Sequence, residues 1–370
     1  MKRVTRRRGW QQLATAAGIA IGAAGGAPFQ GISRTGPPTV SAATAAGALA
    51  AAHERPAPQR RRRKTVWDVL GIHDTPNSGG SRNLEEFHRH LSHLCARWVI
   101  GIIPRPEWYY WAEQIGAVPI TRLMLPGNRF DEEVLRRQLA GVPPNSLVLP
   151  FNEPNLIFET PYPVLPELHA QDLIMAAEVI AQAGSTTLIT PLAQEGALIP
   201  EPGVMIYELE YFQRMLTEMT NLQSVSWIRQ HMALAFHNYH LKYNINPGSD
   251  PFHRLGAYYA HLVVPIIGRL DIYITEGGYF LADVPAIDYY AVAEDTVALL
   301  DTELPPALSD HIKMWSLWVY ANMFQRPPEH QREWEVQRIE RTALWQASGP
   351  TPIYHAIVEY GRRRRAEGHD

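Results

Sequence analysis

The sequence predicts an α/β fold, in which one (β/α)8 TIM barrel follows a signal-like and disordered N-terminal tail. From residue 65 onward, eight strand-like apolar runs alternate with amphipathic segments of helical period. Most of the runs are apolar at every position, which is typical of parallel strands covered on both faces. Eight βα units within about 300 residues fit a closed barrel. The predicted strands span residues 66–73, 98–103, 119–125, 146–151, 186–190, 232–239, 270–275 and 311–318.

A doubly wound open sheet is the structural alternative. Such sheets bind phosphate through a glycine-rich turn after the first strand. Here Gly71-Ile72-His73-Asp74 occupies that place and does not form the G-x-G-x-x-G pattern. We therefore assign residues 65–370 to one barrel domain, whose predicted helices span residues 84–96, 131–140, 170–183, 207–220, 253–267 and 286–300.

The first 64 residues differ from the rest in composition. Basic residues precede an Ala/Gly-rich, weakly apolar stretch, so residues 1–27 have the layout of an export signal, and Thr5-Arg6-Arg7-Arg8-Gly9-Trp10 loosely resembles a twin-arginine signal. Residues 28–64 are rich in Ala, Pro and Arg, which predicts a disordered linker. A secreted or cell-envelope protein is therefore expected. No run reaches the roughly 18 apolar residues of a membrane span, so stable membrane insertion is not expected.

Charge separates the tail from the barrel. Residues 1–64 hold 12 of the 34 basic side chains and one of the 37 acidic ones, so the remainder carries 22 basic and 36 acidic side chains and a net charge of −14. A domain of that charge repels phosphate backbones, which argues against a nucleic-acid partner and leaves neutral polymers open. A monomer is expected, and a single cysteine excludes an internal disulfide.

Two short motifs each place a glutamate at the end of a buried strand-like run. Glu153 follows the fourth run, within Phe151-Asn152-Glu153-Pro154-Asn155, and Glu276 ends the seventh, within Ile274-Thr275-Glu276-Gly277-Gly278-Tyr279. A buried carboxyl group is costly unless it is paired. In a closed barrel both strand ends lie on the face where active sites form, and two carboxyls can divide the acid and nucleophile roles of glycosidic cleavage. The alternative is that both glutamates cap the helices that follow.

The sixth run contributes Phe236-His237-Asn238-Tyr239-His240. His237 and Tyr239 are two residues apart, so they lie on the same side of a strand, and Tyr239 could donate a hydrogen bond that keeps Glu276 ionised. The alternative is that both side chains simply fill the barrel mouth. A zinc site built from His237, His240 and His73 fits the spacing poorly, so no metal site is predicted.

Together these motifs resemble the large clan of retaining (β/α)8 glycoside hydrolases, whose acid/base follows an Asn after strand four and whose nucleophile ends strand seven. The resemblance covers roughly residues 65–360. It implies that Glu153 is the acid/base, Glu276 the nucleophile and Asn152 the group that binds the sugar 2-hydroxyl. It also implies that His237 and Tyr239 meet the substrate and that Trp318, at the end of strand eight, forms the floor under the sugar. Trp315 is expected to face the helices instead.

Three features near the strand ends stay open. His73 and Asp74 end the first run and are predicted to contact sugar hydroxyls, with a capping or turn role as the alternative for Asp74. The clan often has an arginine near the nucleophile, and no arginine here matches that pattern; the candidates are Arg97, Arg105 and Arg122. Aromatic residues crowd the predicted loops and could meet sugar rings or pack against helices. They are Trp108, Tyr109, Tyr110, Trp111, Phe158, Tyr162, Tyr279 and Phe280.

The predicted function is retaining hydrolysis of a β-linked poly- or oligosaccharide by double displacement, without a metal or organic cofactor. One alternative is a catalytically inactive carbohydrate-binding barrel, which the unmatched arginine favours. The other is a metal-dependent barrel hydrolase. The sequence does not name the sugar or the linkage.

Overall fold

The computed structural model describes residues 63–74, 84–156, 164–193, 197–199, 204–241, 251–281, 286–318, 343–346 and 349–368. The chain divides into two units, residues 1–61 and 62–370, and all described residues belong to the second. The predicted signal and most of the predicted linker lie outside the described residues.

The described strands close into a barrel in the order β1-β10-β9-β8-β5-β4-β3-β2, and every pair in it is parallel. This confirms the predicted (β/α)8 barrel. The strands are β1 (Leu70–His73), β2 (Trp98–Ile102), β3 (Val118–Arg122), β4 (Leu147–Leu149), β5 (Thr186–Ile189), β8 (Met232–Leu241), β9 (Ile272–Phe280) and β10 (Ile312–Leu317).

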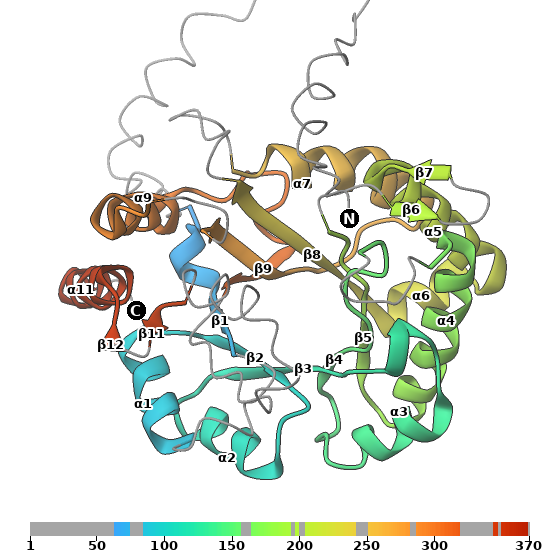
Figure 1. The fold of residues 1–370 in the computed structure, drawn as a ribbon, viewed down its shortest axis with the longest axis horizontal. Coiled ribbons are helices and arrows are strands. Elements are labelled where there is room, and N and C mark those ends of the chain that lie inside the picture. Colours follow the sequence, from blue (N-terminus) through green and yellow to red (C-terminus); the bar gives the residue numbers. More distant parts are fainter. Residues whose placement is uncertain are drawn as a thin grey trace, which may run out of the picture. The chain divides into compact units, whose positions relative to one another are not determined.

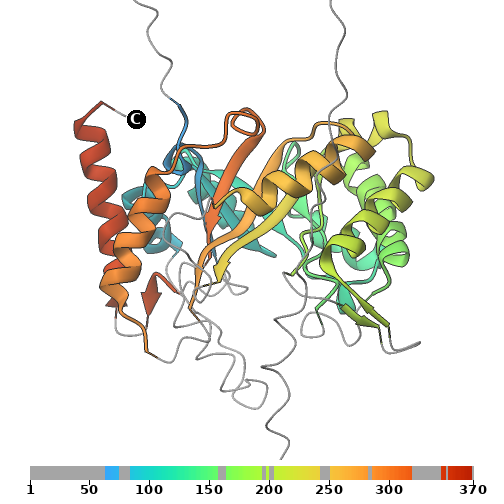
Figure 2. The same ribbon diagram turned by 90° about the horizontal axis from the view of Figure 1, so that it is seen from above.

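Helices surround these strands, as Figure 1 shows, and the turned view of Figure 2 shows helices on both sides of them. The larger ones are α1 (Leu84–His93), α2 (Pro106–Gln114), α3 (Glu132–Leu139), α4 (Pro166–Gln182), α5 (Glu208–Leu222), α6 (Val225–His231), α7 (His253–Tyr258), α9 (Tyr289–Asp301) and α11 (Pro352–Ala366). Two small antiparallel pairs stand outside the barrel, β6 (Ala197–Ile199) with β7 (Val204–Ile206) and β11 (Trp345–Gln346) with β12 (Gly349–Pro350). None of the described helices is long and apolar enough to cross a membrane.

The first predicted strand begins too early. Residues Val66–Val69 form the 3-10 helix η1, and only Leu70–His73 is strand. The cause is a capping box: the Asp68 carboxylate accepts hydrogen bonds from the Thr65 N–H and hydroxyl at 2.8 and 3.1 Å.

The predicted helix 253–267 is interrupted. A π-helical turn, Tyr259–Val263, separates α7 from the short helix α8 (Val264–Ile266). Pro265 is the second residue after this turn. It has no N–H to donate to the carbonyl one turn earlier, so the regular α-helical ladder cannot run through this segment.

The aromatic run after β2 lies on helix α2 instead of a loop, which corrects the prediction for these residues. Trp108 and Tyr109 are buried, and the Tyr109 hydroxyl is 2.7 Å from that of Thr121. A side chain at Gly101 would meet the Trp108 ring at 2.7 Å, so the glycine makes room for the indole. Phe158 and Tyr162 lie outside the described residues.

Two apolar layers hold the barrel. The inner one fills the barrel axis and consists of Ile100, Ile120, Leu149, Leu188, Ala233, Ala235, Tyr273 and Met314. The outer one lies between strands and helices. It includes Trp315, which faces the helices as predicted and packs edge-on against Phe252 with ring centroids 5.1 Å apart. Each inner residue fixes which later residues of its strand face inward, because side chains alternate.

Candidate active site

A polar layer lies directly above the inner apolar layer, toward the C-terminal ends of the strands. Arg122 is two residues after Ile120 on β3, and His237 is two residues after Ala235 on β8. His73 is two residues after Gly71, where a Cβ would meet Met314 at 2.9 Å. The alternation of the strands therefore turns these three polar side chains into the mouth of the barrel.

Glu276 joins this layer because β9 has one extra residue. The register pairs Phe236 with Ile274 but His237 with Glu276, so a β-bulge lies between them. Without it, His237 would face Thr275. The same excess appears against β10. A bulge re-aims the side chains that follow it, and here it turns the glutamate inward.

Both carboxylate oxygens of Glu276 are held by the protein. Arg122 Nη1 donates to Oε1 at 2.9 Å, and the hydroxyl of Tyr239 donates to Oε2. His237 Nδ1 lies 3.6 Å from Oε2. The Arg122 and Glu276 side chains are each more than nine-tenths buried, so this is a desolvated ion pair.

The surroundings act on the ionisation of Glu276 in opposite directions. Burial raises the pKa of Glu276 above its usual value, and the nearby Glu153 adds to the rise. His237, Arg122 and the hydrogen bond from Tyr239 lower the same pKa and oppose it. Burial also raises the pKa of Tyr239 well above 10, so this phenol stays protonated and remains a donor.

Glu153 lies four residues beyond the end of β4, on a backbone held in an unusual conformation. Its φ is +41°, in the left-handed region that non-glycine residues rarely adopt. Its N–H donates to the Pro191 carbonyl at 3.2 Å, and its Oε1 is 2.7 Å from His237 Nδ1. Such strain is kept only where the surroundings fix it, and it is common at functional sites.

The two predicted glutamates meet at the same end of the barrel. One carboxylate oxygen of Glu153, one of Glu276 and one nitrogen of His237 all lie within 4.8 Å of one another. The two carboxyl groups are thus close enough to act on the same bond of a substrate.

His73 lies beside this pair. Its Nδ1 donates to the carbonyl of Asp74, which leaves Nε2 as an acceptor 3.8 Å from Glu276 Oε1. Among the described residues, Nε2 has no hydrogen-bond partner. Burial, followed by the charge of Arg122, lowers the pKa of His73 well below 6.5, so the ring is neutral at neutral pH. A neutral acceptor at this position can bind a hydroxyl group.

The remaining predicted residues lie near the ends of the strands at the same end of the barrel. Trp318 is half-buried, and its ring lies edge-on to His73 with centroids 4.5 Å apart. Asn152 is buried, and its Oδ1 has no hydrogen-bond partner among the described residues. Asp74 is buried directly after β1, where its N–H donates to the Ile100 carbonyl at 2.8 Å. Tyr279 turns away, with its hydroxyl 3.2 Å from the carbonyl of Asp295 on α9.

The sequence left open which arginine lies near Glu276, and the structure shows that it is Arg122. Arg122 is two positions after Ile120, an apolar residue that faces inward, and residues two apart lie on the same side of a strand. This spacing was the signal that could have placed Arg122 in the barrel mouth. A second arginine, Arg254 at the start of α7, supports His237 from behind. Its Nη1 donates to the His237 carbonyl at 2.7 Å and its Nη2 contacts Glu208 at the start of α5. No sequence pattern pointed to this contact.

A cation fits poorly among Glu153, His237 and Glu276. Their oxygen and nitrogen atoms are close enough to ligate one. However, Arg122 and Tyr239 already occupy the two oxygens of Glu276, and His237 Nδ1 is already paired with Glu153. A guanidinium 2.9 Å from a ligand oxygen also repels a metal ion. The side chain of His240 lies outside the described residues.

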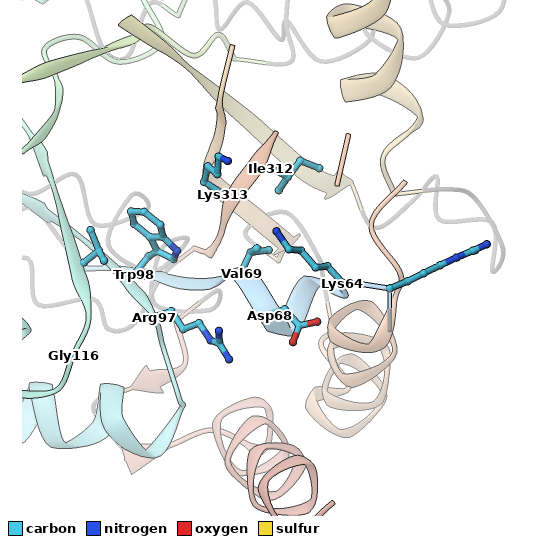
Figure 3. A pocket seen from close by; sticks show the side chains of 10 residues that line it. Lys64, Asp68, Val69, Arg97, Trp98, Gly116, Ile312 and Lys313 are labelled. Carbon is cyan, nitrogen blue, oxygen red and sulfur yellow. The ribbon is translucent and has the colours of Figure 1, made fainter. Parts of the chain in front are cut away.

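A cavity of about 720 Å³ lies at the opposite end of the barrel, where β1, β2, β3 and β10 begin (Figure 3). Four of its ten lining residues are basic, but Arg63 pairs with Glu303 at 2.9 Å and Lys313 with Asp271 at 3.4 Å. Chemistry in this fold takes place at the C-terminal ends of the strands. We therefore assign the candidate active site to the end that holds the carboxylates.

Neither a protein-family model nor a curated protein matches this sequence. Solved structures are similar in fold. An endo-beta-1,3-glucanase of GH128 (subgroup II) from Sorangium cellulosum has a TM-score of 0.51 at 14% identity, over 79% of this chain and 98% of that one. The GH39 enzyme from Xanthomonas axonopodis pv. citri has a TM-score of 0.52 at 12% identity, over 81% and 67%. A glucosidase from Croceicoccus marinus has a TM-score of 0.54 at 9% identity, over 81% and 69%. At these identities the likeness shows the fold.

Proposed function

We propose that the protein is a retaining glycoside hydrolase that cleaves a β-linked poly- or oligosaccharide. The observation that carries this proposal is the distance between the carboxyl groups of Glu153 and Glu276, which have oxygens within 4.8 Å of each other. Carboxyl groups about 5–5.5 Å apart suit double displacement, whereas inversion needs about 6.5–9.5 Å to admit a water molecule.

Glu276 is the proposed nucleophile. It attacks the anomeric carbon and forms the glycosyl-enzyme, for which it must be ionised. Arg122 at 2.9 Å and the hydroxyl of Tyr239 stabilise the anion against its burial. The same two donors fix the carboxylate in one orientation, which favours attack from a single direction.

Glu153 is the proposed acid/base. It protonates the leaving oxygen in the first step and takes a proton from water in the second. His237, 2.7 Å from Glu153 and 3.6 Å from Glu276, lies between the two carboxyls and can hold a proton on Nδ1 toward either of them. Asn152 Oδ1 and His73 Nε2 are acceptors suited to sugar hydroxyls, and Trp318 offers an apolar ring face.

The alternatives now have less support. The unmatched arginine was the argument for an inactive carbohydrate-binding barrel, and Arg122 stands beside Glu276. The metal-dependent hydrolase is disfavoured by the contacts that Arg122 and Tyr239 make to the only described group of possible ligands.

The test is hydrolysis by the purified protein, with the anomeric configuration of the first product read by NMR. β-Glucans and aryl β-glucosides are the first substrates to try, because two of the similar structures are named as a glucanase and a glucosidase. Release of the β-anomer supports the proposal, and release of the α-anomer contradicts retention. Binding without hydrolysis across a broad glycan panel would favour the inactive barrel. Loss of activity on chelation would favour the metal-dependent one.

Secretion and a monomeric state are further proposals from the sequence. Fractionation of cells that express the full chain tests the first, and light scattering of the purified protein tests the second.

A further inference from the structure

Asn152 and Glu153 lie beyond the end of β4, where the main chain no longer pairs regularly with the neighbouring strands. β4 contains only Leu147–Leu149, and the last main-chain bond toward β3 runs from the Leu123 N–H to the Leu149 carbonyl at 2.8 Å. A chain that leaves a sheet in this way needs other partners for its buried N–H and C=O groups.

The side chain of Asn128 supplies both partners for Asn152. Asn152 N–H donates to Asn128 Oδ1 at 3.2 Å, and Asn128 Nδ2 donates to the Asn152 carbonyl at 2.5 Å. The carboxamide of Asn128 thus pairs with the N–H and C=O of Asn152 as the main chain of a neighbouring strand would. Asn128 is buried in the turn after β3, at the end of η2 (Pro126–Asn128), with a left-handed φ of +53° that asparagine tolerates.

The far side of the same segment is held in a matching way. Asn155 Nδ2 donates to the Ala193 carbonyl and Asn155 Oδ1 accepts from the Ala193 N–H, both at 3.0 Å. Glu153 N–H donates to the Pro191 carbonyl. The left-handed backbone of Glu153 therefore lies between one asparagine clamp to the loop after β3 and another to the loop after β5.

We propose that Asn128 is a positioning residue for the acid/base: it fixes the main chain of Asn152 and so directs the carboxyl of Glu153 toward the bond that breaks. This inference rests on the proposed function. It assigns Asn128 no contact with substrate. Its effect passes through Asn152, and a displacement of about 1 Å at a catalytic group can cost on the order of 100-fold in rate.

Asn128→Gly is the direct test, because glycine adopts the left-handed φ without strain and removes only the carboxamide. Asn145→Gly is the matched control. Asn145 also has a left-handed φ, of +62°, but it is exposed in the turn before β4, at the opposite end of the barrel. Asn128→Asp is a second variant of the same size, which keeps the acceptor and loses the donor.

The readout is hydrolysis of phenyl and 2,4-dinitrophenyl β-glucosides. Asn128→Gly is expected to lose about 10- to 100-fold in kcat/KM for the phenyl glycoside and little in kcat/KM for the dinitrophenyl glycoside, because kcat/KM reports the first step and the dinitrophenyl leaving group departs without a proton. Asn128→Asp should show the same selective loss, and Asn145→Gly should match the wild type on both substrates. Equal losses on both substrates, or none, in a folded Asn128 variant would overturn the inference.

If the wild type cleaves neither glucoside nor any glycan of the panel, the proposed function fails first. The clamp is then judged by the crystal structure of Asn128→Gly. The clamp is supported if the main chain of Asn152 and the carboxyl of Glu153 are displaced by about 1 Å or more in this variant. Unmoved atoms contradict it.

Discussion

Tyr239 donates its hydroxyl to Glu276, although the register of β8 and β9 pairs Tyr239 with Gly278. The phenol reaches back along the sheet to Oε2 of the carboxylate, whereas Arg122 donates to Oε1. Glu276, on β9, therefore accepts hydrogen bonds from side chains of two other strands, β3 and β8.

Tyr239→Phe should weaken catalysis without unfolding the protein. A hydrogen bond to a charged group contributes about 1.5–3 kcal/mol, so kcat/KM should fall roughly 10- to 100-fold. The measurement is steady-state hydrolysis of an aryl β-glycoside. Tyr109→Phe is the control, because it removes another buried hydroxyl, bonded to Thr121 away from the carboxylates. Equal losses in both variants would mean that the hydroxyl of Tyr239 has no special role.

Arg122→Met should move the acid limb of the kcat/KM profile to higher pH. Attack requires ionised Glu276, burial raises its pKa and Arg122 lowers it, so loss of the guanidinium raises this pKa further. Breaking a buried pair also costs about 3–5 kcal/mol of stability. Arg122→Lys keeps the charge and should shift the limb less. An acid limb that stays in place in the folded Met variant would show that Glu276 does not set it.

Substitution of the two glutamates should separate their roles. Glu276→Ala should abolish turnover of every substrate, because no glycosyl-enzyme can form. Glu153→Ala should lose about 100- to 10,000-fold with poor leaving groups and far less in the first step with very acidic ones.

Azide distinguishes the two variants. It should replace the missing base in Glu153→Ala and yield the retained glycosyl azide, whereas in Glu276→Ala it should attack from the nucleophile's side and give the inverted one. Glu167→Gln, which affects only a partly exposed pair with Arg214, is the control and should remain active. Swapped stereochemistry of the azides would reverse the assignment.

Removal of residues 1–62 should leave the melting temperature close to that of the full chain. Removal through Val69 should lower it strongly, because it deletes the buried Val66 and Trp67. Trp67 packs edge-on against Tyr360 of α11 with centroids 5.2 Å apart. Thermal unfolding of both truncated proteins is the measurement. A large drop on removal of residues 1–62 alone would show that the tail stabilises the barrel.

The barrel was predictable because eight apolar runs fix eight parallel strands, and strand order then brings Glu153 and Glu276 to one end. Local departures were not predictable from alternation alone. Strict alternation from the inward Tyr273 points Thr275 into the mouth, and only the bulge in β9 puts Glu276 there. The inward position of Arg122 could have been predicted, because it is two residues after the inward Ile120 on the same strand. Asn128 could not, because its role depends on where the turn after β3 lies relative to Asn152.

The described chain starts at Arg63, beside the cavity where β1, β2 and β10 begin, and the carboxylates occupy the other end of the barrel. A bead, tag or fluorescent partner attached in place of residues 1–62 would therefore be joined to the rear of the barrel. Immobilisation through this end should leave the mouth open to long polymer chains, whereas chemical coupling through the loops beyond the strand ends should obstruct it. The direction in which the chain enters the barrel thus makes the N-terminus the suitable handle for a surface-bound form of the protein.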